Sequence, residues 1–220
     1  MTSSLIVLSA TKFGDSSLVL HTISREWGKR SFMVRLGKKP RMALYLPLNI
    51  IEAEIVENPK SSLWTARKAI ASEALTGIRN NIYKNTMTLF MSEVLFRTMK
   101  DGDGDDALFD WCRSSIMTLN ALEADFSNFP IRFVLELTAR LGFSPTLTDI
   151  LPFAGDADVS ANRVEILRTL LEAPFAEAML IPLSGAERNA IAEGLLRYLE
   201  FHTESSINVR SLKVLRELYA

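Results

Sequence analysis

The spacing of apolar residues changes near residue 73, and this change limits the folds open to the chain more than any other feature. Before it, apolar and polar residues alternate over short stretches, as in strands with one buried face. After it, apolar residues recur every three or four positions, as in amphipathic helices. We therefore predict an α+β protein with two domains, a small β-barrel at 1–78 and an all-α helical domain at 79–220.

The predicted strands are short and are separated by glycine and proline, which favour turns. In the clearest of them Phe32, Val34 and Leu36 share one face. The segment 61–72 fits either a strand that closes the barrel or the start of the first helix, and periodicity does not decide between them. The expected strands are 5–11, 17–23, 29–37 and 49–57.

The helical part contains recognisable helix starts and stops. Asn128 stands where an N-cap is expected, and Gly142 can end the same helix in the left-handed conformation. Ser184 and Glu187 have the spacing of a capping box, which marks the start of a second helix. The expected helices occupy 73–100, 107–124, 128–142, 162–173, 184–202 and 209–220.

The formal net charge of −1 conceals an uneven distribution of charge. Residues 1–80 carry 12 Lys or Arg against 6 Asp or Glu, whereas residues 81–220 carry 13 against 20. The stretch 25–41 is the most basic, and unpaired cations are too costly to bury, so most of these side chains must reach the surface. Its cations are Arg25, Lys29, Arg30, Arg35, Lys38, Lys39 and Arg41.

A cationic surface on a small β-barrel favours nucleic acid as the partner. Barrels of the oligonucleotide-binding (OB) type attract phosphates with basic side chains and stack bases on aromatic rings. Trp27, Tyr45 and Phe13 are the candidate stacking residues. One alternative is an edge strand whose lysines only prevent aggregation. Another is a protein–protein adaptor that docks an acidic partner on the basic strand.

The chain lacks the residue sets that common enzymes need. "FGDSSL" (13–18) resembles the nucleophile block of some serine hydrolases, but neither His21 nor His202 stands where the base would be. "DGDGDD" (101–106) begins like a calcium loop and then lacks the required Gly and Glu. There is no phosphate-binding glycine motif. We predict a protein that is not an enzyme and holds no cofactor or metal ion.

Cys112 is the only cysteine, which excludes an internal disulfide and a zinc site built from cysteines. No run of 18 apolar residues predicts a membrane span. The opening "MTSSLIVLSATKF" lacks the basic start and the cleavage pattern of a secretory signal. A cytoplasmic location is therefore expected.

Four segments, taken in order, resemble the RecO family of bacterial recombination mediators. The opening "IVLSATKFGDSSLVLHTISREWGKRSFMVRLGKK" (6–39) and "LYLPLNIIEAEI" (44–55) resemble its N-terminal part. "IRFVLELTARLGFSP" (131–145) and "VRSLKVLREL" (209–218) resemble two of its later helices. The resemblance implies an N-terminal OB-fold followed by a helical domain, and a nucleoid-associated protein that does not use ATP.

The resemblance also implies partners and roles. RecO-like proteins bind single- and double-stranded DNA and anneal strands, and the seven cations of 25–41 would be the DNA contacts. With RecR they load RecA onto single strands coated by the single-strand DNA-binding protein. Arg132 matches the family position that would bind the C-terminal tail of that coating protein. Many members insert a four-cysteine zinc module after "LGFSP", but the corresponding segment 146–162 contains no cysteine, so zinc is excluded there.

Overall fold

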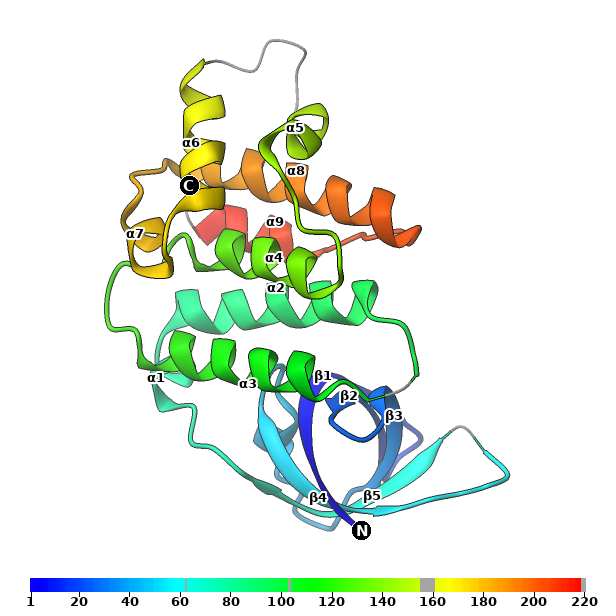
Figure 1. Cartoon of the computed structure of the whole chain (residues 1–220). Helices are drawn as coiled ribbons and strands as arrows, with labels where there is room; N and C mark the ends of the chain where they lie inside the picture. Colours follow the sequence, from blue (N-terminus) through cyan, green and yellow to red (C-terminus); the bar gives the residue numbers. More distant parts are fainter. Residues whose placement is uncertain (62, 103, 155–160, 219–220) are drawn as a thin grey trace. The chain divides into compact units, whose positions relative to one another are not determined.

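The computed structural model describes residues 1–61, 63–102, 104–154 and 161–218 (Figure 1). The chain forms two compact units. The barrel unit consists of residues 1–80 and 99–120, and the helical unit consists of residues 81–98 and 121–220. Each unit thus combines stretches that are distant in sequence, and the predicted domain boundary between residues 78 and 79 stays a prediction.

Five strands close into a barrel in the first unit (Figure 1). Their order around the barrel is β1-β2-β3-β5-β4, with β3 and β5 parallel and the other neighbours antiparallel. A five-stranded closed barrel at the N-terminus confirms the predicted OB-fold. The strands are β1 (Thr2–Phe13), β2 (Ser17–Ser24), β3 (Gly28–Arg35), β4 (Ile50–Val56) and β5 (Trp64–Ala71), so the undecided segment is the strand that completes the barrel.

The barrel encloses a core of alternating apolar residues. Leu20, Phe32 and Ile51 are completely buried, and Val34 is nearly so. Fully burying one such side chain contributes roughly 1.5–3 kcal/mol. The alternation predicted for β3 is therefore confirmed, because its even-numbered positions face the core.

Three helical segments belong to the same unit: η1 (Met42–Tyr45), α1 (Thr76–Arg79) and α3 (Asp106–Ala121). The loop before α3 passes very close to the backbone that follows β2. A Cβ atom added to Gly104 would lie 1.7 Å from the carbonyl oxygen of Arg25, so only glycine fits there. This close approach brings the acidic loop and the start of α3 next to Arg25, the first of the predicted DNA contacts.

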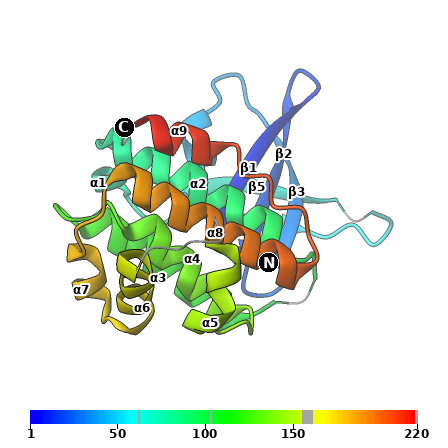
Figure 2. The ribbon, with the colours of Figure 1, turned by 90° about the horizontal axis from the view of Figure 1, so that it is seen from above.

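In the helical unit, α2 packs against α4 and α9, and α4 packs against α8. Figure 2 shows α2, α8 and α9 side by side. None of the described helices is both long and apolar enough to cross a membrane. The elements are α2 (Ile82–Thr98), α4 (Phe129–Arg140), α5 (Leu147–Ile150), η2 (Leu151–Phe153), α6 (Ala161–Glu172), α7 (Phe175–Leu180), α8 (Gly185–Thr203) and α9 (Ser211–Leu218).

Of the three predicted signals for helix ends, two are present and one is not. The capping box of Ser184 and Glu187 is present at α8, and Gly142 ends α4 with φ = +88°. Asn128 occupies the N-cap position of α4 but makes no capping bond. Its amide instead donates to carbonyls at the end of α7, including that of Ala178 at 3.0 Å and that of Ile181 at 2.8 Å. The Asn128 side chain therefore bonds to a segment distant in sequence and does not cap its own helix.

The segment that stands in place of a zinc module is partly helical. Residues 147–150 form α5 and residues 151–153 form η2. Thr146 and Asp149 make a capping box at the start of α5. Residues 155–160 of this segment lie outside the described residues, and residues 161 and 162 belong to α6.

Candidate nucleic-acid interface

Four of the seven predicted DNA contacts lie at the end of β3 and in the loop after it, and all four are exposed. Arg35, Lys39 and Arg41 line a surface hollow of about 360 Å³, and Lys38 lies between them in sequence. The hollow gains another cation from Lys68 of β5. The barrel therefore gathers cations from two strands around one concave surface.

The hollow also has an apolar part. It contains Leu36 from the loop, Tyr45 from η1 and Ile70 from β5, which is 54% exposed. Burial raises the pKa of the Tyr45 phenol above its usual value, so the ring stays neutral at physiological pH. Cations beside a neutral aromatic ring are the combination that binds the phosphate and the base of a nucleotide.

Arg25 and Lys29 form ion pairs with other residues of the barrel unit. Arg25 forms an ion pair with Asp110 of α3. The Nζ atom of Lys29 lies 3.3 Å from a carboxylate oxygen of Asp101 and donates to the carbonyl of Met99 at 2.7 Å. Acidic residues of the 101–110 stretch thus neutralise two of the cations that we expected to face DNA.

Arg30 lies on the other face of β3 from Lys29 and Arg35, because side chains alternate along a strand. Its guanidinium lies 3.5 Å from the ring centroid of Trp64, a cation–π contact. Its Nε atom is buried and has no hydrogen-bond partner among the described residues. The seven cations therefore do not share one face of the sheet, and their assignment as DNA contacts stays a prediction.

The candidate stacking residues also differ in position. Trp27 packs edge-on against Phe32 and Trp64, with a centroid distance of 5.3 Å to Trp64, and so belongs to the end of the barrel core. Phe13, at the end of β1, is 59% exposed. Of the three, Tyr45 is the one that lines the hollow.

The sequence pattern alone does not point to Lys68. The segment that contains it, "WTARKAIA", was not assigned to a strand or a helix, so no face could be given to its cations. The available signal was the pair Arg67–Lys68 within a β-rich stretch, but only the pairing of β5 with β3 and β4 brings it to the hollow.

Arg132 lies on α4 and is largely buried, with 19% of its side chain exposed. Its Nε donates to Glu136, four positions later on the same helix, at 2.7 Å. Its Nη1 donates to the carbonyls of Leu170 and Ala173 at 3.3 and 3.0 Å, at the end of α6. Among the described residues Nη2 donates no hydrogen bond. The predicted tail-binding role stays a prediction.

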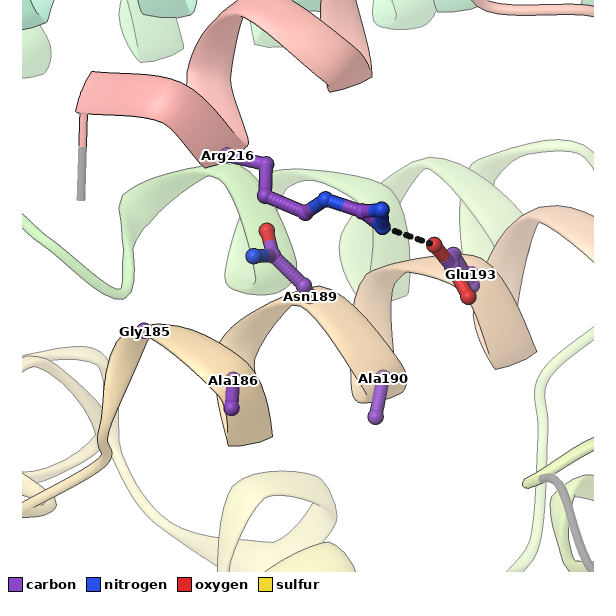
Figure 3. Close-up of a pocket in the computed structure, with 6 residues that line it drawn as sticks. All are labelled: Gly185, Ala186, Asn189, Ala190, Glu193 and Arg216. Carbon is purple, nitrogen blue, oxygen red and sulfur yellow. Dashed lines mark ion pairs between the residues drawn. The ribbon is translucent and has the colours of Figure 1, made fainter. Parts of the chain in front are cut away.

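Another hollow, of about 510 Å³, lies in the helical unit, where the start of α8 faces α9 (Figure 3). Small residues form much of it, namely Gly185, Ala186 and Ala190. Arg216 is the only cation among its described lining residues, and its guanidinium lies 3.7 Å from Glu193. Arg132 is not part of this hollow, so the two are separate features.

The described residues include no group of three or more His, Cys, Asp or Glu side chains arranged to hold a metal ion. Cys112 is buried, and burial raises the pKa of its thiol far above the usual value. His21 lies in β2, where burial lowers its pKa, and its Nδ1 is 2.7 Å from the hydroxyl of Ser31. These groups are parts of the packed barrel unit.

Comparison with known proteins agrees with this architecture. A family model for the N-terminal part of recombination protein O matches residues 1–73, and one for its C-terminal part matches residues 79–149. "DNA repair protein RecO" of Flavobacterium psychrophilum is 24% identical, and that of Flavobacterium johnsoniae is 26% identical. Each alignment covers 98% of this chain and 97% of the relative.

A third relative, "DNA repair protein RecO" of Phocaeicola vulgatus, is 25% identical over 98% of this chain and 97% of its own length. Such low identity over full-length alignments means that the order of segments is kept while most side chains differ. Both family models match in the expected order, and the chain therefore belongs to the RecO family of DNA repair and recombination proteins.

Proposed function

We propose that this protein is a non-catalytic recombination mediator that binds single- and double-stranded DNA at the hollow beside the 37–41 loop. The observation that carries the proposal is the gathering of Arg35, Lys39, Arg41 and Lys68 around Tyr45 on one concave surface. Phosphates supply most of the affinity of such surfaces, and binding releases counterions, so affinity falls steeply with salt.

Annealing needs no bond chemistry on this surface. Two complementary strands repel each other through their phosphates, and a cationic surface that holds both reduces this repulsion. Base pairing then supplies the sequence specificity. In the helical unit acidic residues outnumber basic ones by 15 to 11, which directs DNA to the basic barrel unit.

The proposed partners follow from the family. The protein would act with RecR to load RecA onto single strands coated by the single-strand DNA-binding protein, in the cytoplasm and associated with the nucleoid. Arg132 would bind the C-terminal carboxylate of the coating protein's tail, since a guanidinium can hold a carboxylate with two hydrogen bonds. Tethering at the tail would raise the local concentration of the barrel at coated strands.

Fluorescence anisotropy of a labelled single-stranded oligonucleotide, titrated at several salt concentrations, tests the DNA-binding step. Replacing Arg35, Lys39 and Arg41 with glutamine removes up to three phosphate contacts. The log–log salt slope should then become shallower by about 2, since each single-strand phosphate contributes about 0.7.

The matched control replaces Lys12, Lys60 and Lys100 with glutamine, because these lysines are exposed in the barrel unit but do not line the hollow. Its slope should stay near that of the wild type. Absence of binding at low salt, by wild-type protein shown to be folded, would reject the proposal and leave the adaptor that docks an acidic protein.

A further inference from the structure

Strand β5 contains a bulge that places an unusual residue in its middle. Glu54 of β4 pairs with Arg67, and Glu52 pairs with Ile70, so Lys68 and Ala69 together oppose the single residue Ala53. Lys68 has φ = +52°, a left-handed conformation that residues with a long side chain seldom adopt. Bulges of this kind redirect side chains and recur beside functional sites.

The bulge changes the direction in which Lys68 points. Ala66 is buried in the barrel, and in a regular strand Lys68, two positions later, would also point inward. The extra residue breaks the alternation, and Ala69 packs against the core instead. The Lys68 side chain is 76% exposed and lines the hollow together with Arg35, Lys39 and Arg41. Strained backbone is thus used to bring one more cation to the candidate DNA surface.

This cation has a partner on the neighbouring strand. Its Nζ lies 2.7 Å from a carboxylate oxygen of Glu54, whose side chain is 45% exposed. Ion pairs this open to water are weak and are screened by salt. A DNA phosphate entering the hollow presents the same kind of acceptor, so phosphate and Glu54 compete for one ammonium group.

We propose that Lys68 is a phosphate contact of the hollow and that Glu54 is its internal competitor, which weakens DNA binding. This inference rests on the DNA binding proposed above. In the absence of DNA, Glu54 holds Lys68 in place. When a strand binds, the carboxylate is displaced and stays nearby as a negative charge, which limits affinity and speeds release.

The test uses the same anisotropy titrations with full-length protein. Lys68→Asn and Lys68→Gly both remove the charge, and both new residues tolerate positive φ, so the bulge is kept. Each should weaken binding and make the single-strand salt slope shallower by about 0.7. Two different replacements guard against an effect of altered backbone.

A double-mutant cycle tests the competition. Glu54→Gln should tighten binding by up to about fivefold, the factor that corresponds to the loss of one exposed ion pair. In the Lys68→Asn background, Glu54→Gln should tighten DNA binding only as much as Glu52→Gln does. Glu52→Gln is the control, because it removes an exposed charge from β4 without affecting the Lys68–Glu54 pair.

Equal gains from Glu54→Gln in both backgrounds would reject the competition, because Glu54 would then act only through general charge. An unchanged slope in both Lys68 variants would reject the contact. The two proposals can also be separated. If both Lys68 variants kept the wild-type slope but the triple glutamine variant of Arg35, Lys39 and Arg41 lost affinity, the proposed DNA binding at the hollow would stand and the role of Lys68 would be rejected. Wild-type protein that bound no DNA would overturn both.

Discussion

The guanidinium of Arg25 forms an ion pair with the carboxylate of Asp110, 85 positions later in the chain. One of its two hydrogen bonds joins Nη1 to Oδ2 at 3.0 Å, and the guanidinium carbon lies 4.8 Å from the centroid of the Phe109 ring. Arg25 follows β2 and Asp110 belongs to α3, so the pair fastens α3 to the barrel within one unit. A structural role and a DNA-binding role therefore compete for Arg25.

Replacing Asp110 with asparagine should tighten DNA binding, because Arg25 loses the carboxylate that neutralises it. The affinity for a single-stranded oligonucleotide, measured by anisotropy at low salt, should rise more than in Asp15→Asn. Asp15 is an exposed acid of the β1–β2 turn, and its replacement changes the net charge equally. Equal affinities in the two variants would show that Arg25 does not contact DNA.

The same pair should make stability depend on pH in the acid range. The hydrogen bonds from Arg25 hold the pKa of the Asp110 carboxyl below its ordinary value of 3.8. The stabilisation is therefore complete above about pH 4 and is lost as the pH falls through the lowered pKa. The urea midpoint of the wild type should exceed that of Asp110→Asn at pH 6, and the difference should shrink at pH 3. A constant difference would contradict the pairing.

Besides being a predicted DNA contact, Arg30 should contribute to the stability of the protein. Its guanidinium stacks on Trp64, and such cation–π contacts contribute roughly 0.5–2 kcal/mol. Arg30→Gln should lower the free energy of unfolding by about that amount in urea denaturation. Arg35→Gln, which removes an exposed cation of the same strand, should change it by less than about 0.5 kcal/mol. Similar stabilities for both variants would show that the stacking does not contribute.

The proposed tail-binding role of Arg132 predicts a difference between two arginines of α4. Arg132→Lys keeps the charge but loses the planar fork that holds a carboxylate. It should weaken binding of a peptide from the C-terminus of the single-strand DNA-binding protein by roughly tenfold, measured by calorimetry. Arg140→Lys changes an exposed arginine about two turns away on the same helix and should have little effect.

Circular dichroism must show that Arg132→Lys is folded, because Arg132 also holds the carbonyls at the end of α6. Unchanged peptide affinity in the folded variant would assign Arg132 to this structural task alone. The bonds to Glu136, Leu170 and Ala173 use Nε and both N–H groups of Nη1, so a pair of hydrogen bonds to the tail carboxylate would have to replace one of them.

Local patterns predicted much of the fold. The alternation in β3, the capping box before α8 and the glycine after α4 each depend on neighbours in sequence, and each is present. The segment that became β5 could not be assigned, because its partners β3 and β4 are supplied by the closed barrel. Asn128 failed as a cap for a similar reason, since its hydrogen-bond partners lie about 50 positions away.

The sequence by itself determined that a basic β-barrel precedes an acidic helical part, because periodicity and charge are properties of short stretches. Only the tertiary structure decided which cations face solvent together. It pairs Arg25 and Lys29 with acids of residues 101–110, buries part of Arg30 against Trp64, and brings Lys68 to the hollow. The electrostatic interactions of these cations depend on distances in space, and those distances are set by barrel closure and by one bulge.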